Sequence, residues 1–160
     1  MNTIRKCLVC LATVVACALL PVHASFASPS DTADVQATVK KWIAYLNKRE
    51  SKPLIAACAP HAAIVDGFPP YAWQTCADWW SDYQANNKAI QGTDSKLELG
   101  KLIYEELNGN RAYIIYPATF SDTQKGKSVV YKGTMTMTLK KTKNGWVFTG
   151  AASAWGVNNL

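Results

Sequence analysis

The chain has 160 residues, of which 49% are hydrophobic and 18% are charged, and its formal net charge is +6. With 9 glycines and 7 prolines it is neither collagen-like nor low in complexity, so the composition is globular, and the length fits one domain. The positive charge alone would suggest an acidic partner, but part of it lies in an N-terminal targeting segment.

Residues 1–27 have the pattern of a secretory signal peptide. Two basic residues, Arg5 and Lys6, precede an apolar run over residues 7–20, and small residues at Ala24 and Ala27 offer cleavage sites. The run is shorter than the ~20 residues needed to cross a bilayer. We therefore predict cleavage near one of these alanines and no stable membrane anchor.

Cleavage would leave residues 28–160 as a single domain in the periplasm or outside the cell. A lipoprotein anchored at Cys17 is the alternative, but the chain stays apolar after Cys17, where a lipidated N-terminus normally turns polar. Loss of Arg5 and Lys6 lowers the basic residues from 17 to 15 against 11 acidic ones, so the net charge falls from +6 to +4. No phosphate-binding loop or RNA-binding signature is present, and we predict no cofactor and no nucleic-acid partner.

The first predicted element of the mature chain is a helix that begins near Ala33. Asp31 or Thr32 can cap its start. Its apolar residues recur at helical spacing and would form one buried face, made of Val35, Val39, Trp42, Ile43 and Leu46.

Two more helices are predicted before Gly92, where the hydrophobic pattern changes. A short one covers residues 51–59, because proline is tolerated in a first turn. A brief strand over residues 62–65 leads into a loop over residues 66–70. The third helix starts after Thr75, which serves as N-cap with Asp78 three residues later.

Beyond Gly92 the hydrophobic period changes from that of a helix to that of a strand. Asn108–Gly109 and Asn144–Gly145 are hairpin signals, Gly100 indicates a bulge, and Pro117 indicates a sheet edge or a bulge. The predicted strands cover residues 97–104, 112–120, 129–139 and 146–155. The fold class is therefore α+β, with three N-terminal helices packed on an antiparallel sheet of four to five strands.

Two cysteines, Cys58 and Cys76, remain in the mature chain. An even pair in an exported protein predicts one disulfide; two buried free thiols or one reactive thiol are the alternatives. Neither cysteine lies in a C-x-x-C motif, so redox chemistry is not expected. His61 is the only histidine left beside these two thiols in the mature chain, which is too few ligands for a typical zinc site. No metal site is therefore predicted.

This arrangement resembles the nuclear-transport-factor-2-like superfamily, which includes ketosteroid isomerases and SnoaL-like polyketide cyclases. The resemblance covers about residues 33–156, and its most recognisable parts are residues 47–49, 63–71 and 144–156. It implies a curved sheet that wraps around the helices to form a cone with an apolar pocket at the wide end.

The resemblance also implies a candidate catalytic residue. In ketosteroid isomerases the acidic residue after the short strand is the general base, and Asp66 matches that position. The two oxyanion donors do not transfer, because Trp42 stands where the family has a tyrosine and no acid occurs among residues 136–138. Steroid isomerisation itself is therefore not expected. Asp66 could instead accept backbone N–H bonds in its Asp-Gly turn.

Aromatic residues are the candidates for pocket lining. Those expected to contact a ligand are Trp42, Tyr71, Trp73, Trp79 and Tyr83. The same residues, and Trp80 beside them, could instead form core, which is the commoner role of aromatic residues at helical spacing.

Three functions follow from these predictions. The first is an exported domain that binds a small apolar molecule without strong catalysis. The second is an acid–base enzyme of the isomerase, cyclase or dehydratase type, with Asp66 as base and Trp42 or a strand threonine orienting a carbonyl. The third is a homodimer or partner-interaction module that uses the sheet face.

Overall fold

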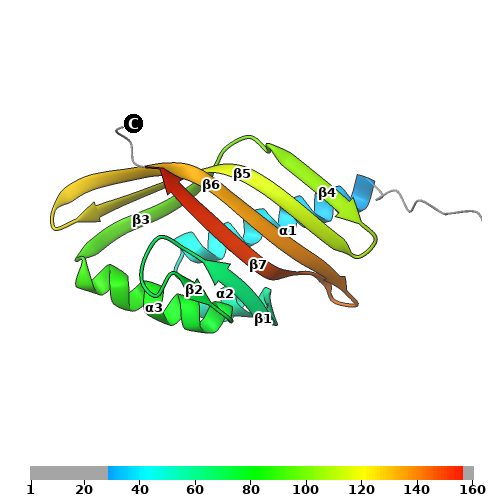
Figure 1. The fold of residues 1–160 in the computed structure, drawn as a ribbon, viewed down its shortest axis with the longest axis horizontal. Helices are drawn as coiled ribbons and strands as arrows, with labels where there is room; N and C mark the ends of the chain where they lie inside the picture. The colour runs from blue at the N-terminus through cyan, green and yellow to red at the C-terminus, as the bar shows by residue number, and fades with distance from the viewer. Residues whose placement is uncertain (1–28, 157–160) are drawn as a thin grey trace, which may run out of the picture.

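The structure is a computed structural model that describes residues 29–156; the predicted signal peptide and its cleavage sites lie outside this range. Its helices are α1 (Pro29–Asn47), α2 (Ser51–Ala56) and α3 (Cys76–Ala89). Its strands are β1 (Cys58–Val65), β2 (Ala72–Trp73), β3 (Gly92–Leu99), β4 (Tyr104–Asn108), β5 (Arg111–Gln124), β6 (Lys127–Thr142) and β7 (Gly145–Gly156). The fold is α+β, as predicted, and Figure 1 shows α1 crossing behind the long strands β5, β6 and β7.

The sheet is larger than predicted and is mixed. Within residues 29–156, its seven strands follow the order β2-β1-β7-β6-β5-β3, and β4 also pairs with β5. Most neighbours are antiparallel, but β1 runs parallel to β7, with residues 63–65 opposite residues 150–152. The prediction of a purely antiparallel sheet of four to five strands is therefore wrong in these details. Parallel pairing of β1 joins segments far apart in the chain, which no local pattern indicates.

Two predicted helix boundaries also need correction. Helix α1 begins at Pro29, before the predicted caps, because proline is well suited to a first helical turn. Helix α2 ends at Ala56 instead of continuing to residue 59. Cys58 already pairs with Phe148 of β7, and the Phe148 N–H donates to the Ala57 carbonyl at 2.9 Å, so the chain enters the sheet early.

The predicted bulged strand over residues 97–104 is two strands. Strand β3 ends at Leu99 and β4 begins at Tyr104, and both pair with β5. Pro117 lies in β5 opposite this break, and its carbonyl accepts the Gly100 N–H at 2.8 Å. Proline lacks an N–H, so it fits where the neighbouring strand is interrupted, although β5 is not an edge strand.

The core lies between α1 and the inner face of the sheet. All five predicted residues of the first helix, Val35, Val39, Trp42, Ile43 and Leu46, are buried. They face a sheet surface whose most buried side chains include Ile114, Met137, Leu139 and Phe148. This is the packing expected when the apolar face of one helix covers a sheet, because alternate residues of each strand point toward the helix.

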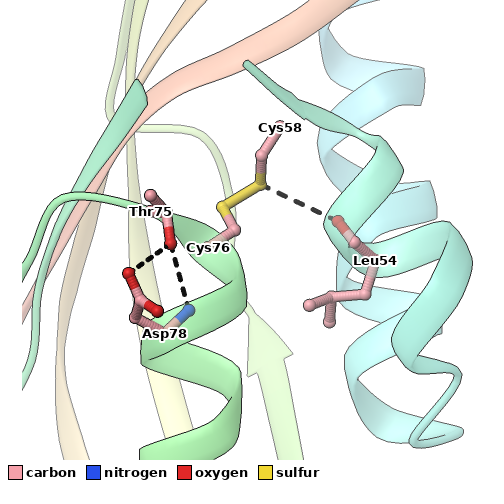
Figure 2. Close-up of a disulfide and its surroundings, with 5 residues drawn as sticks. All are labelled: Leu54, Cys58, Thr75, Cys76 and Asp78. Atoms are coloured by element: carbon pink, nitrogen blue, oxygen red, sulfur yellow. Dashed lines mark hydrogen bonds between the residues drawn. A yellow bond between two sulfur atoms is a disulfide. The ribbon is translucent and has the colours of Figure 1, made fainter. Parts of the chain in front are cut away.

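The predicted disulfide is present. Cys58 at the start of β1 and Cys76 at the start of α3 are joined with a sulfur–sulfur distance of 2.01 Å (Figure 2). Beside it, the predicted N-cap Thr75 accepts the Asp78 N–H at 3.1 Å. A disulfide fits an oxidising compartment. None of the described helices is long and apolar enough to cross a membrane.

Candidate functional site

A cavity of about 490 Å³ opens between the inner face of the sheet, helices α1 and α3, and the loop that follows β1. This volume is within the range of small-molecule sites. Aromatic side chains form much of its wall; they are Trp42, Phe68, Trp79, Tyr83, Phe120, Tyr131 and Trp155. The remaining wall includes aliphatic side chains and a small number of polar ones, among them two aspartates.

Asp66 lies in the cavity wall, one residue after β1, and it is half-buried. Its Oδ1 accepts hydrogen bonds from the Gly67 N–H at 2.8 Å, the Trp155 indole at 3.1 Å and the Ser153 hydroxyl. Its Oδ2 accepts the Trp79 indole N–H at 3.1 Å. A carboxylate offers about four acceptor positions. Three donors share the two positions of Oδ1, and Trp79 occupies one of the two positions of Oδ2, so Asp66 is held in place with one position open on Oδ2.

The loop that carries Asp66 is fixed at both ends. The Asp66 N–H donates to the Tyr71 carbonyl at 3.1 Å, and the Tyr71 N–H donates to the Phe68 carbonyl at 2.8 Å. Strands β1 and β2 then pair through Ile64 and Trp73. These bonds place the carboxylate at the end of a strand that is itself paired to β7, where Ser153 and Trp155 lie.

The structure brings together some of the predicted ligand-contacting residues and separates others. Trp42, Trp79 and Tyr83 line the cavity with Asp66. Tyr71 is 58% exposed and is not among the lining residues, because the loop turns there with a positive φ of 71°. Trp73 is buried in the core instead; its indole donates to Asp82 at 2.8 Å. The inclusion of Tyr71 and Trp73 in the cavity wall is therefore corrected.

The aromatic residues of α1 and α3 form a continuous stack. The ring centroids of Trp42 and Trp79 are 5.7 Å apart, and those of Trp79 and Tyr83 are also 5.7 Å apart. Trp80 stacks on Tyr83 at 5.3 Å but belongs to the core. The two predicted roles of these aromatics, core and cavity lining, are thus both present on one helix.

A second polar group, which the sequence patterns did not indicate, lies in the wall near the end of β5. Asp122 is 3% exposed and lines the cavity, as does Asn87 of α3, which is 8% exposed. Asp122 lies beyond the predicted strand over residues 112–120, but β5 continues to Gln124 and includes it. The alternation of buried residues in β5, extended by two positions beyond Phe120, would have placed Asp122 on the inner face.

Ser95 connects this group to a basic residue. Its hydroxyl is 2.9 Å from Asp122 Oδ1 and 3.2 Å from Asn87 Oδ1. The Arg49 guanidinium donates to the same hydroxyl at 3.1 Å. Ser95 therefore links Arg49 to the Asp122 carboxylate, although Arg49 is not among the residues lining the cavity.

Burial raises the pKa of the Tyr83 hydroxyl above its ordinary value of 10.0, and burial does the same for Tyr116. As the pH rises past 10.0, the unfolded chain releases these protons before the folded protein does. The free energy of unfolding should therefore be unaffected by these groups below that pH and should fall above it. Urea unfolding between pH 9 and 11 measures how steeply the free energy of unfolding falls with pH. We expect a shallower fall in Tyr83→Phe. Identical slopes in the variant and the wild type would contradict the prediction.

The sequence matches no protein-family model, and no curated protein matches it significantly. Solved structures do resemble it. A protein from Caulobacter vibrioides with a cystatin-like fold is 15% identical, with 81% of this chain and 92% of that one covered at a TM-score of 0.66. A nuclear-transport-factor-2-like protein from Novosphingobium aromaticivorans is 12% identical, with coverages of 82% and 84% and a TM-score of 0.64.

A proposed scytalone dehydratase from Novosphingobium aromaticivorans is 8% identical, covering 80% of this chain and 85% of its own, with a TM-score of 0.67. At such identities the likeness concerns the fold. The chain has the nuclear-transport-factor-2-like, cystatin-like fold that its sequence resembles.

Proposed function

We propose that this protein binds a small, largely apolar organic molecule in its aromatic cavity, and that it does so outside the cytoplasm. The observation that carries the proposal is the cavity of about 490 Å³, which the surrounding tryptophans line but do not fill. The predicted signal peptide and the Cys58–Cys76 disulfide support an exported protein.

The bonds of Asp66 favour binding over catalysis as its main role. A general base must accept a proton from its substrate, and Asp66 has only one free acceptor position, because Oδ1 is saturated and Trp79 occupies one position of Oδ2. A carboxylate held by two indoles and a hydroxyl is instead a rigid wall element that orients Trp79 and Trp155. Rigid walls reduce the entropic cost of binding.

Acid–base catalysis remains the second candidate because of one observation on Trp42. Its indole nitrogen is buried and has no hydrogen-bond partner among the described residues, and Trp42 lines the same cavity as Asp66. It could donate to a substrate carbonyl while the open position on Asp66 Oδ2 accepts a proton. The strand threonines Thr136 and Thr138 do not line this cavity. Full retention of any activity by Asp66→Asn would exclude the base role.

Binding can be tested with the neutral fluorescent probe N-phenyl-1-naphthylamine. We expect the disulfide-bonded protein to bind it with enhanced emission, and Ala151→Leu to weaken binding at least tenfold, because Ala151 lines the cavity on β7. Ala154→Leu is the matched control, since Ala154 is exposed on the same strand. Its affinity should stay within twofold of the wild type.

Two results would contradict the proposal. One is a folded wild-type protein, verified by circular dichroism, that does not bind the probe. The other is equal loss of affinity in Ala151→Leu and Ala154→Leu, which would show that the probe does not occupy the cavity.

A further inference from the structure

The cavity has a charge opposite to that of the chain. Although the chain carries a formal charge of +6, the described residues that line the cavity include Asp66 and Asp122 and no lysine, arginine or histidine. A low-dielectric wall strengthens the field of such groups. The wall therefore disfavours anions and favours a ligand that brings positive charge.

Asp122 is the better candidate of the two for contacting that charge. It is 3% exposed, and its Oδ1 accepts the Ser95 hydroxyl at 2.9 Å and the Thr123 N–H at 3.0 Å. Its Oδ2 is buried and has no hydrogen-bond partner among the described residues. Buried polar atoms are rarely left without a partner, and a carboxylate oxygen is among the most costly to leave so.

None of the described residues donates a hydrogen bond to Asp122 Oδ2. The Asn87 amide donates to the Gly92 carbonyl at 3.1 Å and turns its own oxygen toward the carboxylate side. A Cβ at Gly92 would lie 2.2 Å from Asn87 Oδ1 and 2.7 Å from Asp122 Oδ2. Two acceptor oxygens thus converge beside a glycine, and the described residues of the wall include no cationic side chain to pair with them.

Aromatic rings complete this part of the wall. Phe120, two residues before Asp122 on the same face of β5, contacts Tyr131 with ring centroids 6.3 Å apart and Trp155 at 6.1 Å. All three line the cavity. Ring faces attract ammonium groups and also accept flat apolar bodies.

We infer that the ligand is an organic cation, an aromatic or alicyclic body carrying a protonated amine that donates to Asp122 Oδ2. The inference rests on the proposed function and defines its ligand class. The ammonium would provide the missing hydrogen bond and neutralise the buried carboxylate, while the apolar body occupies the aromatic wall. Asp66, already saturated on Oδ1, would hold Trp79 and Trp155 in place.

The test compares three naphthalenes that differ in charge: 1-naphthylmethylamine, 1-naphthalenemethanol and 1-naphthoate. Each competes with N-phenyl-1-naphthylamine at pH 7. In the wild type we expect the amine to bind at least tenfold more tightly than the alcohol, and the carboxylate to bind most weakly. If the fluorescent probe binds but the amine and the alcohol bind equally, the inference is wrong while the proposed function stands. If the probe itself does not bind, the proposed function fails.

Variants then locate the charge recognition. Asp122→Asn should lose the preference for the amine, so that the amine and the alcohol bind this variant with affinities within twofold of each other. Asp94→Asn, an exposed site on β3, is the matched control for losing one negative charge and should keep the preference. Loss of the preference in Asp66→Asn combined with its retention in Asp122→Asn would overturn the assignment to Asp122.

A measurement on the wild type covers the case in which Asp122→Asn does not fold. The Thr123 N–H reports on Asp122, and the Trp155 indole N–H reports on Asp66. In nitrogen–proton spectra, replacing the alcohol with the amine should shift the Thr123 resonance more than the Trp155 indole resonance. The opposite order would overturn the inference.

Discussion

Replacing Cys58 and Cys76 together with serine is expected to lower the free energy of unfolding by about 3 kcal/mol. The two cysteines are 18 positions apart and form a disulfide. Closing a loop of this length removes conformational entropy from the unfolded chain, which is worth about 3 kcal/mol in the chain-entropy model. For a domain of ordinary stability this is a large part of the total.

The same substitution should also weaken ligand binding. The disulfide joins the first residue of β1 to the first residue of α3 (Figure 2). Strand β1 leads to Asp66, and α3 carries Trp79, whose indole donates to that carboxylate. Without the cross-link, the two sides of this hydrogen bond are connected mainly by packing. We expect a several-fold loss of affinity for N-phenyl-1-naphthylamine.

Urea unfolding of the oxidised wild type, the reduced wild type and the double serine variant measures the effect. The reduced protein and the variant should agree, because both lack the same cross-link. A single variant, Cys58→Ser, is the less suitable choice, because it leaves Cys76, which is 2% exposed, as a free thiol. Equal unfolding midpoints with and without the disulfide would contradict the prediction.

The elements that depend on nearby residues could be predicted from the sequence. The five apolar positions of α1 repeat at helical spacing, and all five are buried. Thr75 caps α3 as its spacing to Asp78 indicates. The hairpins at residues 108–111 and 142–145 follow from their Asn-Gly pairs. In each case a short stretch of chain contains the whole physical cause.

Features that join distant segments could not be predicted in this way. Strand β1 pairs with β7, although most of the chain separates the two strands in sequence. The helical pattern after Pro53 extends past Cys58, where this pairing begins. The resemblance placed Asp66 correctly after the short strand, but two of its donors, Ser153 and Trp155, lie 87 and 89 positions away. Only the folded sheet brings them to the same carboxylate.

Gly133 of β6 makes the second strong prediction, because it sets how closely β6 and β7 approach beside Asp66. It is paired with Trp155 of β7. A Cβ at Gly133 would lie 1.9 Å from the Ala154 carbonyl oxygen and 2.9 Å from the Ala154 carbonyl carbon. A Cβ has no rotamer that avoids backbone atoms, so in Gly133→Ala one strand must move.

We expect Gly133→Ala to lower the free energy of unfolding by about 3 kcal/mol, at the upper end of overpacking effects. Ser153 and Trp155 flank Ala154, so the displacement of β7 should also withdraw two donors from Asp66. The Trp155 indole N–H resonance and the affinity for N-phenyl-1-naphthylamine measure this second effect. We expect a shifted resonance and at least tenfold weaker binding.

Gly156→Ala separates this steric cause from any general effect of adding a methyl group at the end of the sheet. Gly156 pairs with Lys132, the residue next to Gly133, and its Cβ would lie 3.4 Å from the Lys132 carbonyl oxygen, an ordinary contact. The free energy of unfolding of Gly156→Ala should stay within about 0.5 kcal/mol of the wild type.

If both alanine variants unfold at the wild-type urea concentration, stability does not require the close approach of β6 and β7. If Gly133→Ala loses stability but keeps the Trp155 resonance and full probe affinity, Asp66 is held independently of β7, and the rigid wall proposed for the cavity would then depend on Trp79 and the loop alone.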